Sequence, residues 1–236
     1  MTASPPSLYL LDIEGTVAPL TLTADLLFPF ARAHFPQFLH ANAAEPLVRA
    51  DLALLAEENR AEKDPDSPAF SHPEDLRQAL DYLSWLMDRD RKSTALKSLQ
   101  GKIWKQGFES GDLQGIFFPD VPPALKRWSA AAKVAIYSSG SVEAQQLLFR
   151  HSNFGDLTPH LSGYFDTRTG PKAEPASYQT IANDMHVEPS QLQFFSDAMR
   201  ELDAARSAGC ATRLVVRPGN PAVENPNGHP AVESFE

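Results

Sequence analysis

The chain has 236 residues, enough for roughly one and a half domains of about 150 residues and for a core that needs neither disulfides nor a structural metal to fold. Its formal net charge of −9 makes nucleic acid and anionic membranes poor partners, because both are bound by positively charged surfaces. Cys210 is the single cysteine, which excludes an intramolecular disulfide and a cysteine metal cluster.

Targeting signals are absent from the sequence pattern. No apolar run approaches the ~20 residues of a membrane span, and no basic stretch precedes the apolar run near the N-terminus, as a signal peptide would require. We therefore expect a cytoplasmic protein, and we expect it to be a monomer.

Short apolar runs without polar alternation recur along the chain and predict strands buried on both faces of a parallel sheet. In chain order they are Leu8–Leu11, Val134–Tyr137, Gly163–Asp166, Leu192–Phe195 and Leu214–Val216. Helical stretches long enough for crossover connections lie between them, over residues 121–132, 141–151, 174–186 and 199–208. The alternation predicts an α/β domain with a parallel sheet, followed by an irregular, proline-rich tail from Pro218.

The segment 23–118 breaks this rhythm, because it contains helical patterns and no convincing strand. The clearest helical patterns cover Ala50–Arg60, Glu74–Arg89 and Ser93–Lys105. We therefore expect a helical cap over residues 23–118, inserted between the first and second strands of a core formed by residues 1–22 and 119–236.

Basic residues are concentrated in one part of this cap. The window from Arg89 to Lys105 has a net charge of +5. It is either a solvated helix face or a surface that attracts an anionic substrate.

Acidic and hydroxyl residues directly follow three of the predicted strands. They are Asp12 and Glu14, Ser138 to Ser141, and Ser196 with Asp197. Each alone fits a turn or a helix cap equally well, but the carboxyl ends of parallel strands meet at one edge of the sheet, where ligands bind. Together they predict a site.

The chemistry of that site can be read from its acids. A carboxylate at a strand end suits Mg²⁺, which takes one or two carboxylates plus water and phosphate oxygens. Such a carboxylate can also attack phosphorus, while a second acid protonates the leaving oxygen and then activates water. Gly15 allows the sharp turn that brings Asp12 and Glu14 to the same space.

These segments, in this order, resemble the four motifs of the haloacid dehalogenase (HAD) superfamily of phosphohydrolases. The matching segments are Asp12-Ile13-Glu14-Gly15-Thr16, Tyr137-Ser138-Ser139-Gly140-Ser141-Val142-Glu143-Ala144-Gln145, Lys172 with Ser177-Tyr178, and Ser196-Asp197 with Glu201. Together with Val215-Val216-Arg217-Pro218-Gly219-Asn220, they resemble its enolase-phosphatase branch, which acts in methionine salvage. The resemblance covers nearly the whole chain and implies a Rossmann-like parallel sheet with a helical cap.

The resemblance also implies a role for each site residue. Asp12 would be the nucleophile and a Mg²⁺ ligand, and Glu14 the general acid and base, with its main-chain carbonyl as a further ligand. Asp197 would complete the protein's ligands to one Mg²⁺ per chain, and Glu201 would orient Asp197 or a bound water. The phosphoryl group would be bound by four residues: Ser138, Ser139, Gly140 and Lys172.

The reaction implied is the conversion of 2,3-diketo-5-methylthiopentyl-1-phosphate to 1,2-dihydroxy-3-keto-5-methylthiopentene and phosphate, through an aspartyl-phosphate. Three alternatives stay open. Another phosphatase or phosphomutase of the superfamily would act on a different small organic or sugar phosphate. A dehalogenase would not need Mg²⁺. A catalytically silent regulator would bind phosphate without turnover.

Overall fold

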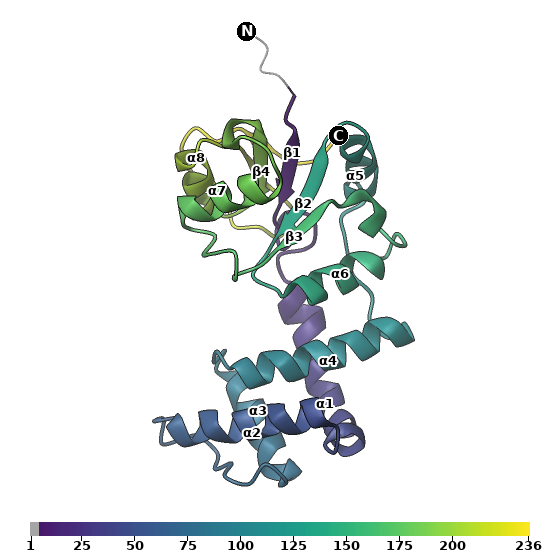
Figure 1. Cartoon of the computed structure of the whole chain (residues 1–236), viewed down its shortest axis with the longest axis vertical. Helices are drawn as coiled ribbons and strands as arrows, with labels where there is room; N and C mark the ends of the chain where they lie inside the picture. The colour runs from purple at the N-terminus through teal and green to yellow at the C-terminus, as the bar shows by residue number, and fades with distance from the viewer. Residues whose placement is uncertain (1–4) are drawn as a thin grey trace. The chain divides into compact units, whose positions relative to one another are not determined.

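The structure is a computed structural model that describes residues 5–236. Six strands form one sheet in the order β3-β2-β1-β4-β5-β6, and every neighbouring pair is parallel (Figure 1). Their bounds are β1 Leu8–Leu11, β2 Lys133–Tyr137, β3 Gly163–Phe165, β4 Leu192–Ser196, β5 Ala211–Val215 and β6 Ala231–Val232. The parallel α/β fold predicted from the apolar runs is confirmed.

Helices cover both faces of the sheet, because alternate residues of each buried strand point to opposite sides. Leu8 and Leu10 of β1 join the cluster under α7 (Pro175–Asp184) and α8 (Met199–Ser207). Between them, Tyr9 stacks on Trp128 of α5 (Val121–Ser129), with 4.6 Å between ring centroids. Figure 1 shows α7 and α8 on one side of the strands and α5 on the other. The remaining short elements are α6 (Val142–Arg150), η2 (Thr158–His160) and η3 (Pro189–Gln191).

The strand order places a topological switch point at β1. The chain runs outward from β1 to β2 and β3, and then returns to the other side of β1 with β4. In open parallel sheets, ligands bind outside the carboxyl ends of the strands at such a switch point. Asp12 follows β1 and Asp197 follows β4, so both lie at this end of the sheet.

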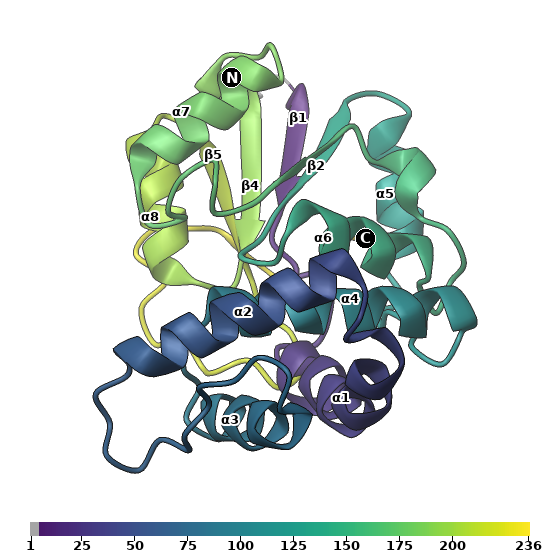
Figure 2. The same ribbon diagram turned by 60° about the horizontal axis from the view of Figure 1, so that its bottom comes forward.

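The segment between β1 and β2 is helical. It contains a short π-helical turn and four helices: η1 (Thr23–Leu27), α1 (Phe28–Asn42), α2 (Pro46–Ala61), α3 (Leu76–Asp88) and α4 (Thr94–Ser110). Figure 2 brings α1 to α4 forward, and α4 packs on both α1 and α2. Their inner faces share an apolar cluster that includes Leu55, Phe70 and Leu99, all with no exposed surface.

One helix of this segment, α1, was not among the clear sequence patterns. Pro36 lies inside it, where proline removes one backbone hydrogen bond and normally interrupts a helix. The neighbouring Phe35, Phe38 and Leu39 are buried in the cluster. Their packing offsets the cost of the proline, as tertiary contacts provide most helical stability in proteins.

The chain divides into two compact units, Met1–Leu22 with Gln114–Glu236, and Thr23–Leu113. We call the first the sheet unit and the second the helical unit. Residues 1–4 belong to the predicted core but lie outside the described residues. Residues 114–118 fall in the sheet unit, where the Gly115 and Phe118 amides donate to the carbonyls of His151 and Val17 at 2.9 and 3.1 Å.

The proline-rich tail is irregular from Val216 to Pro230 within the described chain. It then forms β6, which extends the sheet beside β5. A strand of two residues has no period that a sequence pattern could reveal, so β6 depends on its pairing with β5.

Candidate active site

The candidate site begins with Asp12, held at the end of β1. The Asp12 amide donates to the Phe195 carbonyl at 3.0 Å, which continues the β1–β4 pairing by one residue. Its side chain is only 11% exposed. Oδ1 accepts a hydrogen bond from the Ile13 amide at 2.7 Å and contacts Lys172 Nζ at 2.7 Å. One backbone hydrogen bond and two side-chain contacts therefore hold Asp12, the predicted nucleophile, in place.

A tight turn follows Asp12 and carries the half-buried Glu14. The Ile13 carbonyl accepts from the amides of Thr16, Val17 and Ala18, and the Gly15 amide donates to the Ala18 carbonyl at 2.9 Å. Gly15 has φ +69°, and a Cβ at this position would lie 2.4 Å from Asp197 Oδ2. Only glycine fits there, so the first and fourth motifs meet at Gly15 and Asp197.

Lys172 bridges two of the acids. Its ammonium lies 2.7 Å from both Asp12 Oδ1 and Glu201 Oε2, and its side chain is 12% exposed. Burial alone lowers the pKa of Lys172, but the charges of Asp12 and Glu201 outweigh burial and raise the pKa above its ordinary value. Lys172 is therefore a charged partner that lets two carboxylates share one buried place.

Three hydroxyl groups hold the loop that carries Lys172. Tyr137 donates to the Gly170 carbonyl at 2.8 Å, Ser177 to the Pro171 carbonyl at 2.8 Å, and Tyr178 to the Lys172 carbonyl at 2.7 Å. Tyr137 belongs to β2 and the other two to α7. Tyr137 belongs to the second motif, and Ser177 and Tyr178 to the third, but their positioning role is visible only in the structure.

The end of β4 adds Ser196, Asp197 and, from the first turn of α8, Glu201. The buried Ser196 Oγ lies 3.0 Å from Glu201 Oε2 and 3.5 Å from Asp12 Oδ2. Burial, together with the charge of Asp12, raises the pKa of Asp197 to about 6. The same two causes raise the pKa of Glu201. The site thus holds more negative charge than Lys172 alone balances.

Ser138, Ser139 and Gly140 follow β2, the strand beside β1, and so lie at the same edge of the sheet. The Gly140 amide donates to Ser138 Oγ at 3.3 Å. Buried Gln145 of α6 donates from Nε2 to the Gly140 and Phe165 carbonyls at 2.8 and 2.9 Å. These bonds hold the loop at the start of α6, a place suited to an anion.

The donor set fits a magnesium ion. Among residues 5–236, no three or more His, Cys, Asp or Glu side chains are gathered as a metal site. The set predicted from the resemblance is different: two carboxylates, Asp12 and Asp197, and the main-chain carbonyl of Glu14. Two carboxylates with open positions for water and phosphate oxygens match the preference of Mg²⁺. Burial and the charge of Asp12 both raise the pKa of Asp197, and a hard cation bound there would favour its carboxylate form.

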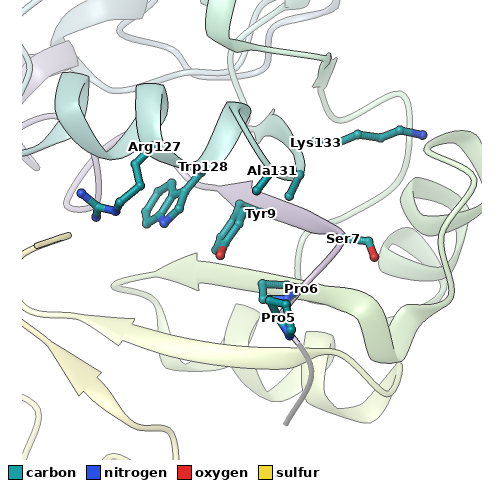
Figure 3. A pocket seen from close by; sticks show the side chains of 9 residues that line it. Pro5, Pro6, Ser7, Tyr9, Arg127, Trp128, Ala131 and Lys133 are labelled. Atoms are coloured by element: carbon teal, nitrogen blue, oxygen red, sulfur yellow. The ribbon is translucent and has the colours of Figure 1, made fainter. Parts of the chain in front are cut away.

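A separate pocket of about 690 Å³ lies at the other end of the sheet (Figure 3). Tyr9 and Trp128 line it, with Ser7 and Lys133 at the amino ends of β1 and β2. Lys133 Nζ donates to the Met185 carbonyl at 2.6 Å, so this cation is already engaged. No acid lines the pocket among the described residues, and it shares no residue with the candidate site.

No helix in the described part of the chain is long and apolar enough to cross a membrane.

Comparison with known proteins places the chain among hydrolases. The family model described as haloacid dehalogenase-like hydrolase matches residues 6–209. A protein named enolase-phosphatase E1 from Synechococcus elongatus is 55% identical over 216 residues, which cover 91% of this chain and 90% of that protein.

Similar relatives extend over both units. The enolase-phosphatase E1 of Leptospira borgpetersenii is 44% identical over 230 residues, covering 97% of this chain and 96% of that protein. Among solved structures, the UTR4 protein from Saccharomyces cerevisiae matches with a TM-score of 0.80 at 36% identity, covering 98% of this chain and 99% of that chain. The similarity therefore includes the helical segment between β1 and β2 as well as the sheet.

Proposed function

The chain belongs to the haloacid dehalogenase-like hydrolases and, among them, to the enolase-phosphatases of methionine salvage, and from this premise we propose its substrate and the roles of its residues. We propose that it converts 2,3-diketo-5-methylthiopentyl-1-phosphate to 1,2-dihydroxy-3-keto-5-methylthiopentene and phosphate. The observation that supports this substrate is the 55% identity to an enolase-phosphatase E1 over 91% of the chain. The cluster at the switch point, where Lys172 lies 2.7 Å from both Asp12 and Glu201, supports phosphoryl transfer.

The phosphatase half uses Asp12 and Glu14. A carboxylate oxygen of Asp12 attacks phosphorus, the bond from phosphorus to the ester oxygen breaks, and that oxygen takes a proton from Glu14. Water then attacks the aspartyl-phosphate, gives a proton to Glu14, and releases phosphate and the free Asp12 carboxylate. The hydrogen bond from Ile13 and the contact with Lys172 keep Asp12 oriented for this attack.

The phosphoryl group needs positioning and charge compensation more than covalent chemistry. We propose that the Ser138 hydroxyl, the Ser139 and Gly140 amides and the Lys172 ammonium bind it. Gln145 supports this by fixing the Gly140 carbonyl at 2.8 Å. Enzymes of this family generally use Mg²⁺, which when bound would offset the charge of Asp12, Asp197 and the phosphate. We propose one ion per chain.

The enolase half requires a base beside the carbon acid, and we propose Glu14. Its side chain is one methylene longer than that of Asp. It extends from a turn in which the next residue, Gly15, lies close to Asp197. Glu14→Asp should lower the rate of ultraviolet-detected enol formation more than the rate of phosphate release. Equal losses in the two rates would remove the reason for giving Glu14 the enolase role.

The reaction is tested by incubating the protein with the diketone phosphate and Mg²⁺ while enol absorbance and free phosphate are followed together. We expect both signals from the wild-type protein and no phosphate release from Asp12→Asn, which lacks the attacking carboxylate. Full activity of that variant would overturn the mechanism. Phosphate retained on a rearranged product would indicate a mutase, and tight binding without turnover would indicate a regulator.

The helical unit is proposed as the lid of this site. The chain enters it within a few residues of the Glu14 turn, and closure would exclude water while the diketone is held. The cytoplasmic location and the monomeric state stay predictions from the sequence.

A further inference from the structure

Two residues of the tail reach the turn that carries Glu14. Asn220 Nδ2 donates to the Gly15 carbonyl at 2.8 Å and to the Val215 carbonyl at 3.3 Å. Arg217 Nε donates to the Thr16 carbonyl at 2.9 Å. Gly15 and Thr16 are the two residues directly after Glu14, so the tail binds the turn close to that side chain.

Arg217 is itself held on several sides. It is 5% exposed, and Nη1 contacts Asp120 Oδ2 at 2.9 Å and donates to the Glu233 carbonyl at 3.0 Å. Its guanidinium carbon lies 4.5 Å from the ring centres of both Phe118 and Phe235. These contacts restrain the planar guanidinium, with Nε directed at the Thr16 carbonyl.

These donors complete the turn, because its own hydrogen bonds use other groups. The turn's amides donate to the carbonyls of Ile13 and Ala18. The carbonyls of Gly15 and Thr16 are not used in this way and accept from the tail instead. Displacing the turn would also disturb the close approach of Gly15 to Asp197. The tail therefore binds the turn at a place that adjoins both Glu14 and Asp197.

Within residues 5–236, some buried polar atoms of Arg217, Asn220 and the turn have no hydrogen-bond partner, which would not be expected if these residues served only to fill the core. Arg217 Nη2, Asn220 Oδ1 and Thr16 Oγ1 are buried without a hydrogen-bond partner among the described residues. Burying unpaired polar atoms costs stability, and such departures from ideal packing tend to mark functional places.

We propose that Arg217 and Asn220 are positioning residues that hold the turn after Asp12 and thereby set the place of Glu14 for proton transfer. The inference rests on the proposed role of Glu14 for its catalytic consequence. Its structural part, that the tail holds the turn, stands on the two carbonyl contacts alone.

The test compares two Asn→Ala variants in the same tail. Asn220→Ala removes the donor to Gly15, and Asn220→Asp keeps the shape but replaces the donor with an acceptor. Asn227→Ala is the matched control, because its Nδ2 donates to Asp203 Oδ1 at 2.8 Å and none of its described contacts reaches the turn. Rates on the diketone phosphate are normalised to the folded fraction of each variant.

We expect both Asn220 variants to lower kcat by roughly 10- to 100-fold, the scale of a small misplacement of a reacting group. KM should change by no more than about twofold, as for an interaction that acts on the reacting group rather than on binding. Amide hydrogen exchange of unliganded protein should increase over residues 13–18. Asn227→Ala should leave kcat within about twofold and exchange over 13–18 unchanged.

Equal kcat losses in Asn220→Ala and Asn227→Ala would overturn the inference, as would unchanged exchange over residues 13–18. Arg217→Lys, which keeps the charge but loses the fork, should reproduce the Asn220 pattern where it folds. If the wild-type protein releases no phosphate from the ester, the proposed function fails. The exchange comparison needs no substrate and still decides whether Asn220 holds the turn.

Discussion

The sheet unit and the helical unit bury different kinds of groups. Across the described residues, the helical unit contains one buried polar side chain, Gln100, whereas the sheet unit buries Asp12, Thr16, Ser196, Arg217 and others. Two ion pairs of the helical unit, Arg32–Asp88 and Arg89–Asp66, lie at exposed positions. A third, Lys102–Asp51, is partly buried, with side chains 28% and 13% exposed. In the sheet unit, the side chains that pair with Lys172 and Arg217 are no more than 20% exposed.

The difference shows what each unit has to accomplish. Apolar packing is sufficient to hold four helices together, and exposed ion pairs add little stability. Buried charges cost stability unless they are paired, so the sheet unit carries them where phosphoryl chemistry needs preorganised charge. Substitutions in the sheet unit should therefore affect activity first, and those in the helical unit stability first.

The largest effect is expected for Lys172→Met. Loss of the ammonium removes a charge from the proposed phosphoryl site, and kcat should fall by roughly 10²- to 10³-fold or more. It also leaves Asp12 and Glu201 buried without their partner, which should lower the free energy of unfolding by about 3–5 kcal/mol. Phosphate-release kinetics and urea denaturation measure the two effects.

Lys133→Met is the matched control, because Lys133 lies at the amino end of β2 and its ammonium donates to the Met185 carbonyl, away from the candidate site. It should leave kcat unchanged. A similar kcat loss in both variants would show that the Lys172 effect is not local to the site.

Leu99→Ala should produce the next largest effect, and on stability. Leu99 has no exposed surface and lies in the apolar cluster of the helical unit, so the cavity should cost about 2–5 kcal/mol. Hydrogen exchange should increase over α1 to α4 and not over β1 to β5. Leu47→Ala, at a 72% exposed position of α2, should change stability by no more than about 0.5 kcal/mol.

A smaller effect is expected for Glu58→Ala. Its Oε1 accepts from the Thr94 and Ala95 amides at 2.9 and 3.3 Å, and Ser93 Oγ also donates to its carboxylate, so Glu58 caps the start of α4. Loss of a helix cap costs about 1 kcal/mol, measurable by thermal denaturation. Glu57→Ala, at the exposed neighbouring position, should have no comparable effect, and equal losses would contradict the capping role.

The smallest effect is expected for Asp203→Asn, and it should depend on pH. The hydrogen bond from His229, with help from Asn227, lowers the pKa of Asp203 below its ordinary value of 3.8. A lowered pKa in the folded state stabilises the fold above the ordinary pKa, and this contribution is lost as pH falls through the lowered value. The difference in Tm between wild type and variant should therefore be present at neutral pH and disappear in strong acid. A constant difference would contradict the ionic origin.

Much of the sheet unit could be predicted from the sequence because its signals are local. Apolar runs identified the strands, and the residues directly after them, such as Asp12, Ser138 and Asp197, were candidates because parallel strands end at one edge. Helical patterns predict the helical unit, but α1 is not among the clear patterns because Pro36, a residue that normally interrupts helices, lies inside it. Lys172 was found through the resemblance, not through any local signal.

The sequence by itself determined which residue types stand at the ends of the buried strands, and hence the chemistry available there. Only the tertiary structure decided what holds those residues in place. Tyr137 and Tyr178 fix the Lys172 loop, and Arg217 and Asn220 reach the Glu14 turn from 201 and 205 residues away. A local pattern records the conformation of neighbouring residues, whereas contacts over such separations exist only once the sheet has brought distant segments together.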